Sequence, residues 1–121
     1  MSSELPTQTP TSLVKAAVLG AAGYSGAELC ALLTRNPYFE LCFAYASAGR
    51  KAEPFSSLYP RFQQQVDVLV EPWTDDEIAR ITGKVDVAFL ALPHEASEEV
   101  APKLMAAGIV VVDLSGAFRL K

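Results

Sequence analysis

Few residues in this sequence are of the kinds that build metal centres or disulfide frameworks. Its 121 residues include two cysteines, Cys30 and Cys42, and a single histidine, His94. The cysteines do not form a CxxC pair, and His94 has no second histidine to accompany it. We therefore expect neither a zinc site nor a disulfide scaffold, and no bound metal.

Long apolar runs and blocks of like charge are missing as well. No apolar run approaches the roughly 20 residues that cross a bilayer, and the N-terminus lacks the basic-then-apolar order of a secretory signal. The formal net charge is −4, and charges of one sign do not cluster. The sequence thus predicts a cytoplasmic protein with no general affinity for nucleic acid or for membranes.

Hydrophobic residues make up 50% of the chain, which is enough for the core of one globular domain. Residues 1–13 are rich in Ser, Thr, Gln and Pro and predict a flexible leader. Between residues 14 and 121, short apolar runs alternate with helical stretches, which is typical of βαβ units. We expect an α/β domain of the Rossmann type, with a doubly wound, mainly parallel sheet and helices on both faces.

The expected elements follow from the spacing of apolar residues and from residues that end helices. Strands are predicted at Val14–Leu19, Phe39–Ala46, Val66–Val70, Val85–Leu92 and Ile109–Leu114. Helices are predicted at Ser25–Asn36, Asp75–Ile81 and Glu95–Ala107. We expect Thr74 to cap the second helix, Pro102 to kink or restart the third, and Gly108 to end it. Ser47–Gln65 is predicted to be a long surface excursion with one short helical turn near Phe55–Leu58.

A glycine pattern joins the first predicted strand to the first helix. Its spacing is GxxGxxG, where Gly20 allows a tight turn, Gly23 lets backbone approach a pyrophosphate, and Gly26 permits close packing of helix and strand. The helix that follows points its unpaired N–H groups and positive end at the same place. Since such a pattern can also be a mere turn, its setting in a βαβ unit carries the prediction. The turn residues predicted to bind a dinucleotide are Gly20, Ala22, Gly23, Tyr24, Ser25 and Gly26.

The end of the second strand indicates which dinucleotide is bound. An NAD site places Asp or Glu there to accept hydrogen bonds from ribose hydroxyls, whereas this sequence continues with Ser47, Arg50 and Lys51. Ser47 can donate to the additional phosphate of NADP, and the two cations can neutralise it. We therefore predict NADP(H), the alternative being that Arg50 and Lys51 are solvated loop charges.

Three blocks of sequence together resemble the N-acetyl-γ-glutamyl-phosphate reductases. The blocks are GAAGYSGAEL from Gly20, VAFLALPH from Val87 and DLSGAFRL from Asp113. In the first block Ala22 stands where the family often has Ser, so one phosphate contact is in doubt. The aspartate-semialdehyde dehydrogenases are related to this family but match less well at Leu92–His94 and Asp113–Ser115.

The resemblance implies an enzyme of arginine biosynthesis that reduces N-acetyl-γ-glutamyl phosphate to the semialdehyde with NADPH, releasing phosphate. In that family a cysteine of a second domain attacks the acyl phosphate, so we expect the nucleophile beyond Lys121 and this chain, lacking that domain, to be inactive alone. Cys30 and Cys42 are predicted to be small buried hydrophobic residues. The full-length protein is expected to form a homo-oligomer.

The resemblance also implies site residues beyond the glycine turn. Leu92, Pro93 and His94 would line the cofactor cleft, and Ser115 and Gly116 would lie near the nicotinamide. Arg119 would grip the phosphate of the substrate. The alternatives are that His94 caps a helix or lies on the surface, and that Arg119 is a surface residue. Two other readings stay open, namely a non-catalytic nucleotide-sensing module and a structural domain that binds nothing.

Overall fold

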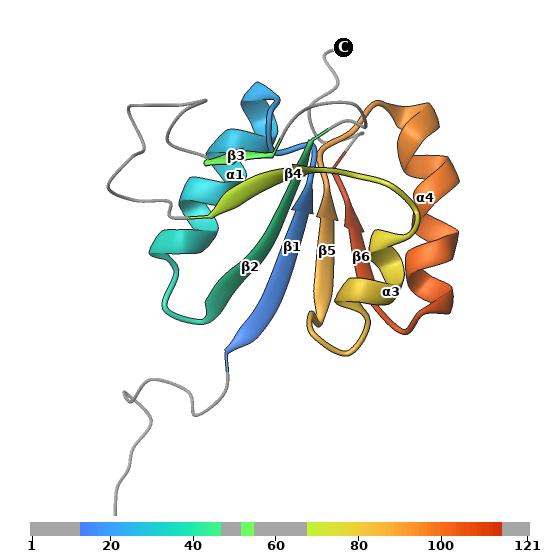
Figure 1. Ribbon diagram of the computed structural model, residues 1–121. Coiled ribbons are helices and arrows are strands. Elements are labelled where there is room, and N and C mark those ends of the chain that lie inside the picture. Colours follow the sequence, from blue (N-terminus) through green and yellow to red (C-terminus); the bar gives the residue numbers. More distant parts are fainter. Residues whose placement is uncertain (1–12, 47–51, 55–67, 115–121) are drawn as a thin grey trace, which may run out of the picture.

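The protein is described by a computed structural model covering residues 13–46, 52–54 and 68–114 (Figure 1). The strands in these ranges are β1 (Val14–Leu19), β2 (Phe39–Ala46), β3 (Glu53–Pro54), β4 (Leu69–Pro72), β5 (Val87–Leu90) and β6 (Val110–Asp113). The helices are α1 (Tyr24–Arg35), α3 (Glu77–Ile81) and α4 (His94–Ala106). No helix in this part of the chain is long and apolar enough to cross a membrane.

The strands form one sheet in the order β3-β4-β2-β1-β5-β6. All pairings are parallel except that of β3 with β4, which is antiparallel. The chain winds outwards from β1 in one direction through β2 and β4, and in the other through β5 and β6. This reversal at β1 is the switch point of a Rossmann-type sheet, and it confirms the predicted fold class.

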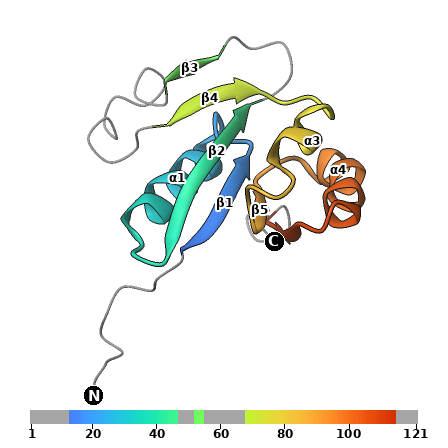
Figure 2. The same ribbon diagram turned by 60° about the horizontal axis from the view of Figure 1, so that its bottom comes forward.

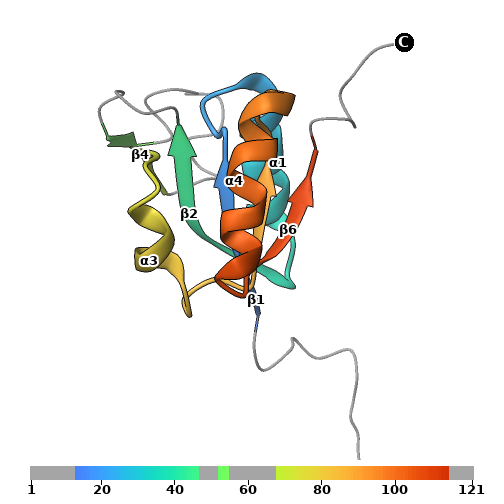
Figure 3. The ribbon, with the colours of Figure 1, turned by 90° about the vertical axis from the view of Figure 1, so that its right-hand side faces the viewer.

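Helices cover both faces of the sheet, α1 on one side and α3 and α4 on the other (Figures 2 and 3). The side chains of β1 alternate between the two layers: Ala16 and Val18 belong to the core beneath α1, and Ala17 and Leu19 to the core beneath α3 and α4. Since Ala16–Leu19 is buried on both faces, this part of β1 is the continuous apolar run typical of a central parallel strand.

Strand β2 contains an irregularity at Cys42. Ala16 pairs with Leu41 and Ala17 with Phe43, so one residue of β2 has no partner in β1. Cys42 and Phe43 consequently both contact the α3/α4 core, while Leu41 packs on the α1 side. The bulge shifts the alternation of every later residue in the strand by one position.

The ends of a strand were predicted best where the local sequence, rather than pairing with a distant strand, determines them. The predictions for β1 and β2 are confirmed residue for residue. The strand predicted at Val66–Val70 is instead Leu69–Pro72, because its pairing with Ala44–Ala46 of β2 decides which residues are extended. Strands β5 and β6 are shorter than predicted, because they pair with each other at only four positions.

The antiparallel strand β3 was not predicted. It is two residues long and lies inside the predicted excursion Ser47–Gln65. A strand this short carries no readable alternation of polar and apolar residues, so only its partner Leu69–Val70 defines it. The rest of that segment, including the predicted helical turn at Phe55–Leu58, lies outside the described residues.

Helix α1 lies one residue earlier than predicted at both ends. Its C-cap Asn36 has extended backbone (φ −85°, ψ 125°), as the residue before Pro37 should. The predicted cap of α3 is wrong: the N-cap is Asp76 rather than Thr74, and Thr74 contributes its carbonyl, which accepts from the N–H of Glu77 at 2.9 Å.

Helix α4 passes through Pro102 without a break, so the predicted restart does not occur. Its side chains Val100 and Leu104 are buried on either side of the proline, and this packing keeps the helix together. Gly108 ends the helix as predicted, with φ +86°. Its N–H donates to Met105 at 3.0 Å and that of Ile109 to Leu104 at 3.1 Å, which is a Schellman motif.

Candidate functional site

The glycine turn lies at the carboxyl edge of the sheet, fixed between β2 and β5. The N–H groups of Gly20 and Ala21 both donate to the carbonyl of Tyr45, at 2.8 and 2.9 Å. Gly20 has φ +98°, and a methyl group on it would overlap the carbonyl oxygen of Ala91. Both the backbone conformation and the close approach of β5 therefore require glycine here, as the tight-turn prediction expects.

Gly26 is required for a different reason. Its φ is not positive, but an added Cβ would overlap the carbonyl oxygen of Gly20 and crowd Ala21. Helix α1 therefore crosses the end of β1 with backbone against backbone. The predicted role of Gly26 in close packing is confirmed.

Gly23 differs from its two neighbours in the pattern because the fold does not require it. It is the exposed N-cap of α1, with φ −83° and ψ 166°, and an added Cβ would meet only the Gly20 oxygen, at an ordinary 3.5 Å. No side-chain hydrogen bond caps α1 at this residue. Residue 23 therefore places no side chain over the positive end of the helix, which is a position that binds anions in other proteins.

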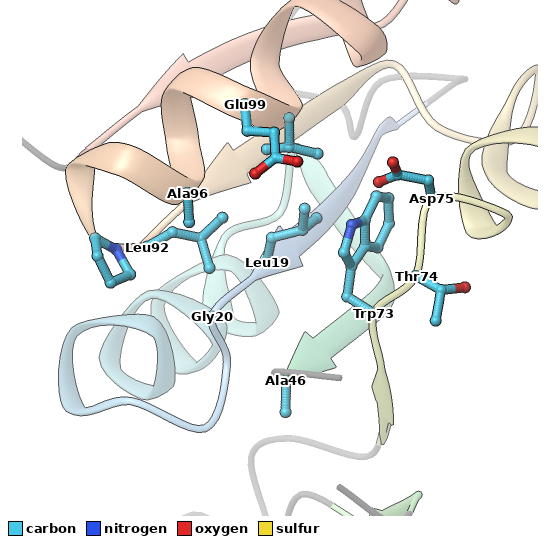
Figure 4. A pocket seen from close by; sticks show the side chains of 11 residues that line it. Leu19, Gly20, Ala46, Trp73, Thr74, Asp75, Leu92, Ala96 and Glu99 are labelled. Atoms are coloured by element: carbon cyan, nitrogen blue, oxygen red, sulfur yellow. The ribbon is translucent and has the colours of Figure 1, made fainter. Parts of the chain in front are cut away.

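A cavity of about 610 Å³ opens beside the turn, at the carboxyl ends of β1, β2 and β4 (Figure 4). It is lined by Leu19, Gly20, Ala46, Trp73, Thr74, Asp75, Leu92, Pro93, Ala96, Glu99 and Val100. Most of this lining is apolar, and the carboxylates of Asp75 and Glu99 are its charged groups (Figure 4). Its size and character are those of a site for a small organic ligand.

The structure brings together only part of the predicted site. Gly20, Leu92 and Pro93 share the cavity, next to the helix end at Gly23. His94 does not line it: the side chain is 52% exposed, and Nε2 lies 2.9 Å from Glu98 Oε2 on the same helix. Ser47, Arg50, Lys51, Ser115, Gly116 and Arg119 lie outside the described residues, so their predicted roles stay predictions.

Sequence reasoning missed the residues that follow β4. Trp73, Thr74 and Asp75 form one wall of the cavity, opposite Ala96 and Glu99 of α4. Ligands of open α/β sheets bind beyond the carboxyl ends of strands, and that rule would have marked Trp73 had the strand been placed correctly. The predicted strand ended at Val70, two residues before the observed end.

Tyr45 holds this wall in place. The indole ring of Trp73 meets the Tyr45 ring edge-on, with centroids 4.9 Å apart, and the backbone N–H of Trp73 donates to the carbonyl of Ala46 at 2.9 Å. The buried Tyr45 hydroxyl donates to Glu77 Oε1 at 2.8 Å, and Arg80 donates to the same oxygen at 2.9 Å. Burial, and after it the hydrogen bond to Glu77, raise the pKa of Tyr45, so the hydroxyl stays a donor.

The two cysteines lie away from the cavity lining, and both are free thiols. Cys30 is a fully buried residue of α1, where burial raises the pKa of its thiol from 9.0 to about 12. Burial, followed by the charge of Glu40, also raises the pKa of half-buried Cys42. Neither thiol has the lowered pKa of a catalytic nucleophile. Among the described residues, no three His, Cys, Asp or Glu side chains come together as metal ligands.

We expect the buried Cys30 thiol to make the chain less stable in alkali. Above about pH 9 the unfolded chain loses the proton of this thiol while the folded chain keeps it, so the free energy of unfolding falls until about pH 12. Urea midpoints at about pH 8 and about pH 10 should therefore fall further for the native sequence than for Cys30→Ala. Equal falls would contradict the assignment. Iodoacetamide should label Cys30 only after unfolding.

The sequence profile of one protein family matches residues 15–121. That family is described as the NAD-binding domain of semialdehyde dehydrogenase. Among curated relatives, N-acetyl-gamma-glutamyl-phosphate reductase of Aeromonas salmonicida is 42% identical over 111 residues, and that of Bacillus cereus 40% over 108. The matches cover 90% and 89% of this chain, but the chain spans only about a third of the length of these relatives, 33% and 30%.

Solved structures with the same fold include two enzymes above a quarter identity. Aspartate semialdehyde dehydrogenase from Candida albicans, solved with NADP, is 26% identical with a TM-score of 0.62, over 84% of this chain and 29% of that one. A probable aspartate-semialdehyde dehydrogenase from Pseudomonas aeruginosa is 28% identical with a TM-score of 0.57, over 89% of this chain and 30% of that one. Both likenesses agree with the profile match.

Proposed function

Because the chain belongs to the family of semialdehyde dehydrogenase NAD-binding domains, we propose that it is the NADP(H)-binding part of an N-acetyl-γ-glutamyl-phosphate reductase. The observation that carries the proposal is the open, positive end of α1 at Gly23, a position where the fold itself leaves room for a side chain. The identity of 42% to the Aeromonas salmonicida reductase supports the choice of substrate.

In this proposal the chain binds and orients the cofactor. The first-turn N–H groups of α1 donate to the diphosphate, and the helix dipole stabilises its charge. Gly23 keeps that approach free of side-chain atoms, while Gly20 and Gly26 hold the turn against the sheet. Bound NADPH supplies the hydride, and the nucleophilic thiol belongs to the part of the enzyme beyond Lys121.

The preference for NADP(H) over NAD(H) rests on Ser47, Arg50 and Lys51. These residues follow β2, where an NAD enzyme commonly has a carboxylate for the ribose hydroxyls. A cation here favours the additional phosphate by direct charge attraction. Arg119 is proposed to hold the phosphate of the acyl-phosphate substrate, and Ser115 and Gly116 to lie near the nicotinamide.

A second candidate is the corresponding part of an aspartate-semialdehyde dehydrogenase. The two solved structures at 26% and 28% identity favour it. The higher identity of the reductases, 40–42% over nearly the same residues, makes it the weaker candidate. In either case the proposal includes a cytoplasmic location and a homo-oligomeric full-length enzyme.

The proposal predicts that the 121-residue chain binds NADPH more tightly than NADH. Titration with each cofactor, following the fluorescence of the reduced nicotinamide, should give an affinity at least about tenfold higher for NADPH, since one charge contact to a phosphate contributes of this order. The double variant Arg50→Ala/Lys51→Ala should lose that preference and keep its affinity for NADH. If the folded chain binds neither cofactor, the proposed function is wrong.

A further inference from the structure

The cavity beside the glycine turn differs chemically from the helix end next to it. Leu19, Leu92 and Val100 give it apolar walls (Figure 4). Its charged groups are the carboxylates of Asp75 and Glu99, and Lys103 Nζ lies 2.6 Å from the first and 4.0 Å from the second. In the part of the chain that the structure describes, this lining contains no cationic side chain to bind a phosphate, whereas the end of α1 attracts one. The two sites therefore suit different parts of one ligand, with the diphosphate at Gly23 and an uncharged ring in the cavity.

The position of the cavity decides which ring of a dinucleotide it faces. Ala46 at the end of β2 and Trp73 after β4 lie on its wall, so it extends to the β2 side of the switch point. In Rossmann-type sheets the end of β2 holds the ribose of the adenosine half. The ring that reaches Trp73 is then the purine base, not the nicotinamide.

We propose that the side chain of Trp73 recognises the adenine base of the dinucleotide, which lies against the indole in this cavity. The inference rests on the proposed function, since it presumes that a dinucleotide is bound. A ring held by apolar contact gains most from a large, rigid aromatic partner. Trp73 meets this need, because the edge-on ring of Tyr45 and the backbone bond to Ala46 already fix its place.

The first test uses the fact that Trp73 is the sole tryptophan of the chain. Adding 2′,5′-ADP, which contains the adenine half, should change the tryptophan emission, and adding nicotinamide mononucleotide should not. The reverse pattern would overturn the assignment of the base, while leaving cofactor binding itself intact.

The second test is substitution. Trp73→Ala should weaken binding of NADPH by about 5- to 100-fold, as loss of an aromatic partner to a base does elsewhere, and Trp73→Phe should retain most of the affinity. Affinity for reduced nicotinamide mononucleotide should be unchanged in both variants. Tyr38→Ala, which removes a 54% exposed aromatic ring outside the cavity lining, is the matched control.

The outcomes separate the inference from the proposed function. Unchanged NADPH affinity in Trp73→Ala, or equal weakening of the mononucleotide, would overturn the role of Trp73 while the native chain still binds cofactor. Absence of NADPH binding by the native chain would instead defeat the proposed function. Should Trp73→Ala fail to fold, the emission test on the native chain still decides.

Discussion

Gly20→Ala is expected to lower the free energy of unfolding by about 3–5 kcal/mol, enough to unfold most of a small domain. Two effects add. An alanine at φ +98° pays the cost of a left-handed backbone, on the order of 1–3 kcal/mol, and its methyl group would also overlap the carbonyl oxygen of Ala91. Because that oxygen belongs to the chain leaving β5, the sheet must open at its switch point to make room. Urea unfolding measures the loss.

Gly83→Ala provides the matched control for this prediction. Gly83 also has a left-handed backbone, with φ +81°, but an added Cβ would meet nothing within 4 Å. The free energy of unfolding of Gly83→Ala should therefore fall only by the cost of the left-handed backbone, about 1 kcal/mol. If Gly20→Ala is no less stable than Gly83→Ala, then the contact between the glycine turn and β5 is not as tight as the structure has it.

Gly23→Asp is expected to change stability and cofactor binding in opposite directions. At the N-cap of α1, where φ −83° suits any residue, the carboxylate can accept from first-turn N–H groups and should add a few tenths of a kcal/mol to stability. The same carboxylate would occupy the space proposed for the diphosphate and repel its negative charge, so affinity for NADPH should fall by about 100-fold. Thermal unfolding and cofactor titration of one sample give both numbers.

Gly23→Asn separates charge from size. Asn has nearly the shape of Asp and is an equally good N-cap, yet it adds no negative charge. Its affinity for NADPH should lie between those of Gly23→Asp and the native chain. A Gly23→Asp variant that keeps native affinity would place the diphosphate elsewhere and remove the main support for the proposed function.

The glycine turn shows how far sequence could go. The roles of Gly20 and Gly26 follow from a local pattern after an apolar strand, and both are confirmed by what a Cβ would meet. Strands β1 and β2 were predicted in full for the same reason, since each is a run that is apolar apart from one charged residue, Lys15 or Glu40, and is ended by a recognisable turn residue or loop.

The residues that were missed depend on contacts between distant segments. Trp73 lines the cavity because it follows the end of β4, and the pairing of β4 with β2 sets that end at Pro72. The apolar run in the sequence suggested an end two residues earlier, at Val70. His94 was expected in the cofactor cleft because the family resemblance implies it there together with Leu92 and Pro93, but as the first residue of α4 it pairs with Glu98, one turn along. Sequence neighbours at the start of a helix point in different directions, so adjacency alone could not place it.

The bulge at Cys42 has a consequence for the whole site. If Cys42 paired in regular alternation and β2 had no bulge, the Tyr45 ring would lie on the α1 face, away from Trp73, and Ala44 or Ala46 would occupy its place. The bulge, rather than the chemistry of the residues that follow it, thus selects which layer receives the phenol. Deletion of Cys42 should accordingly remove the bulge and still leave the Tyr45 ring against Trp73, because the residues that remain alternate between the two layers as they do now.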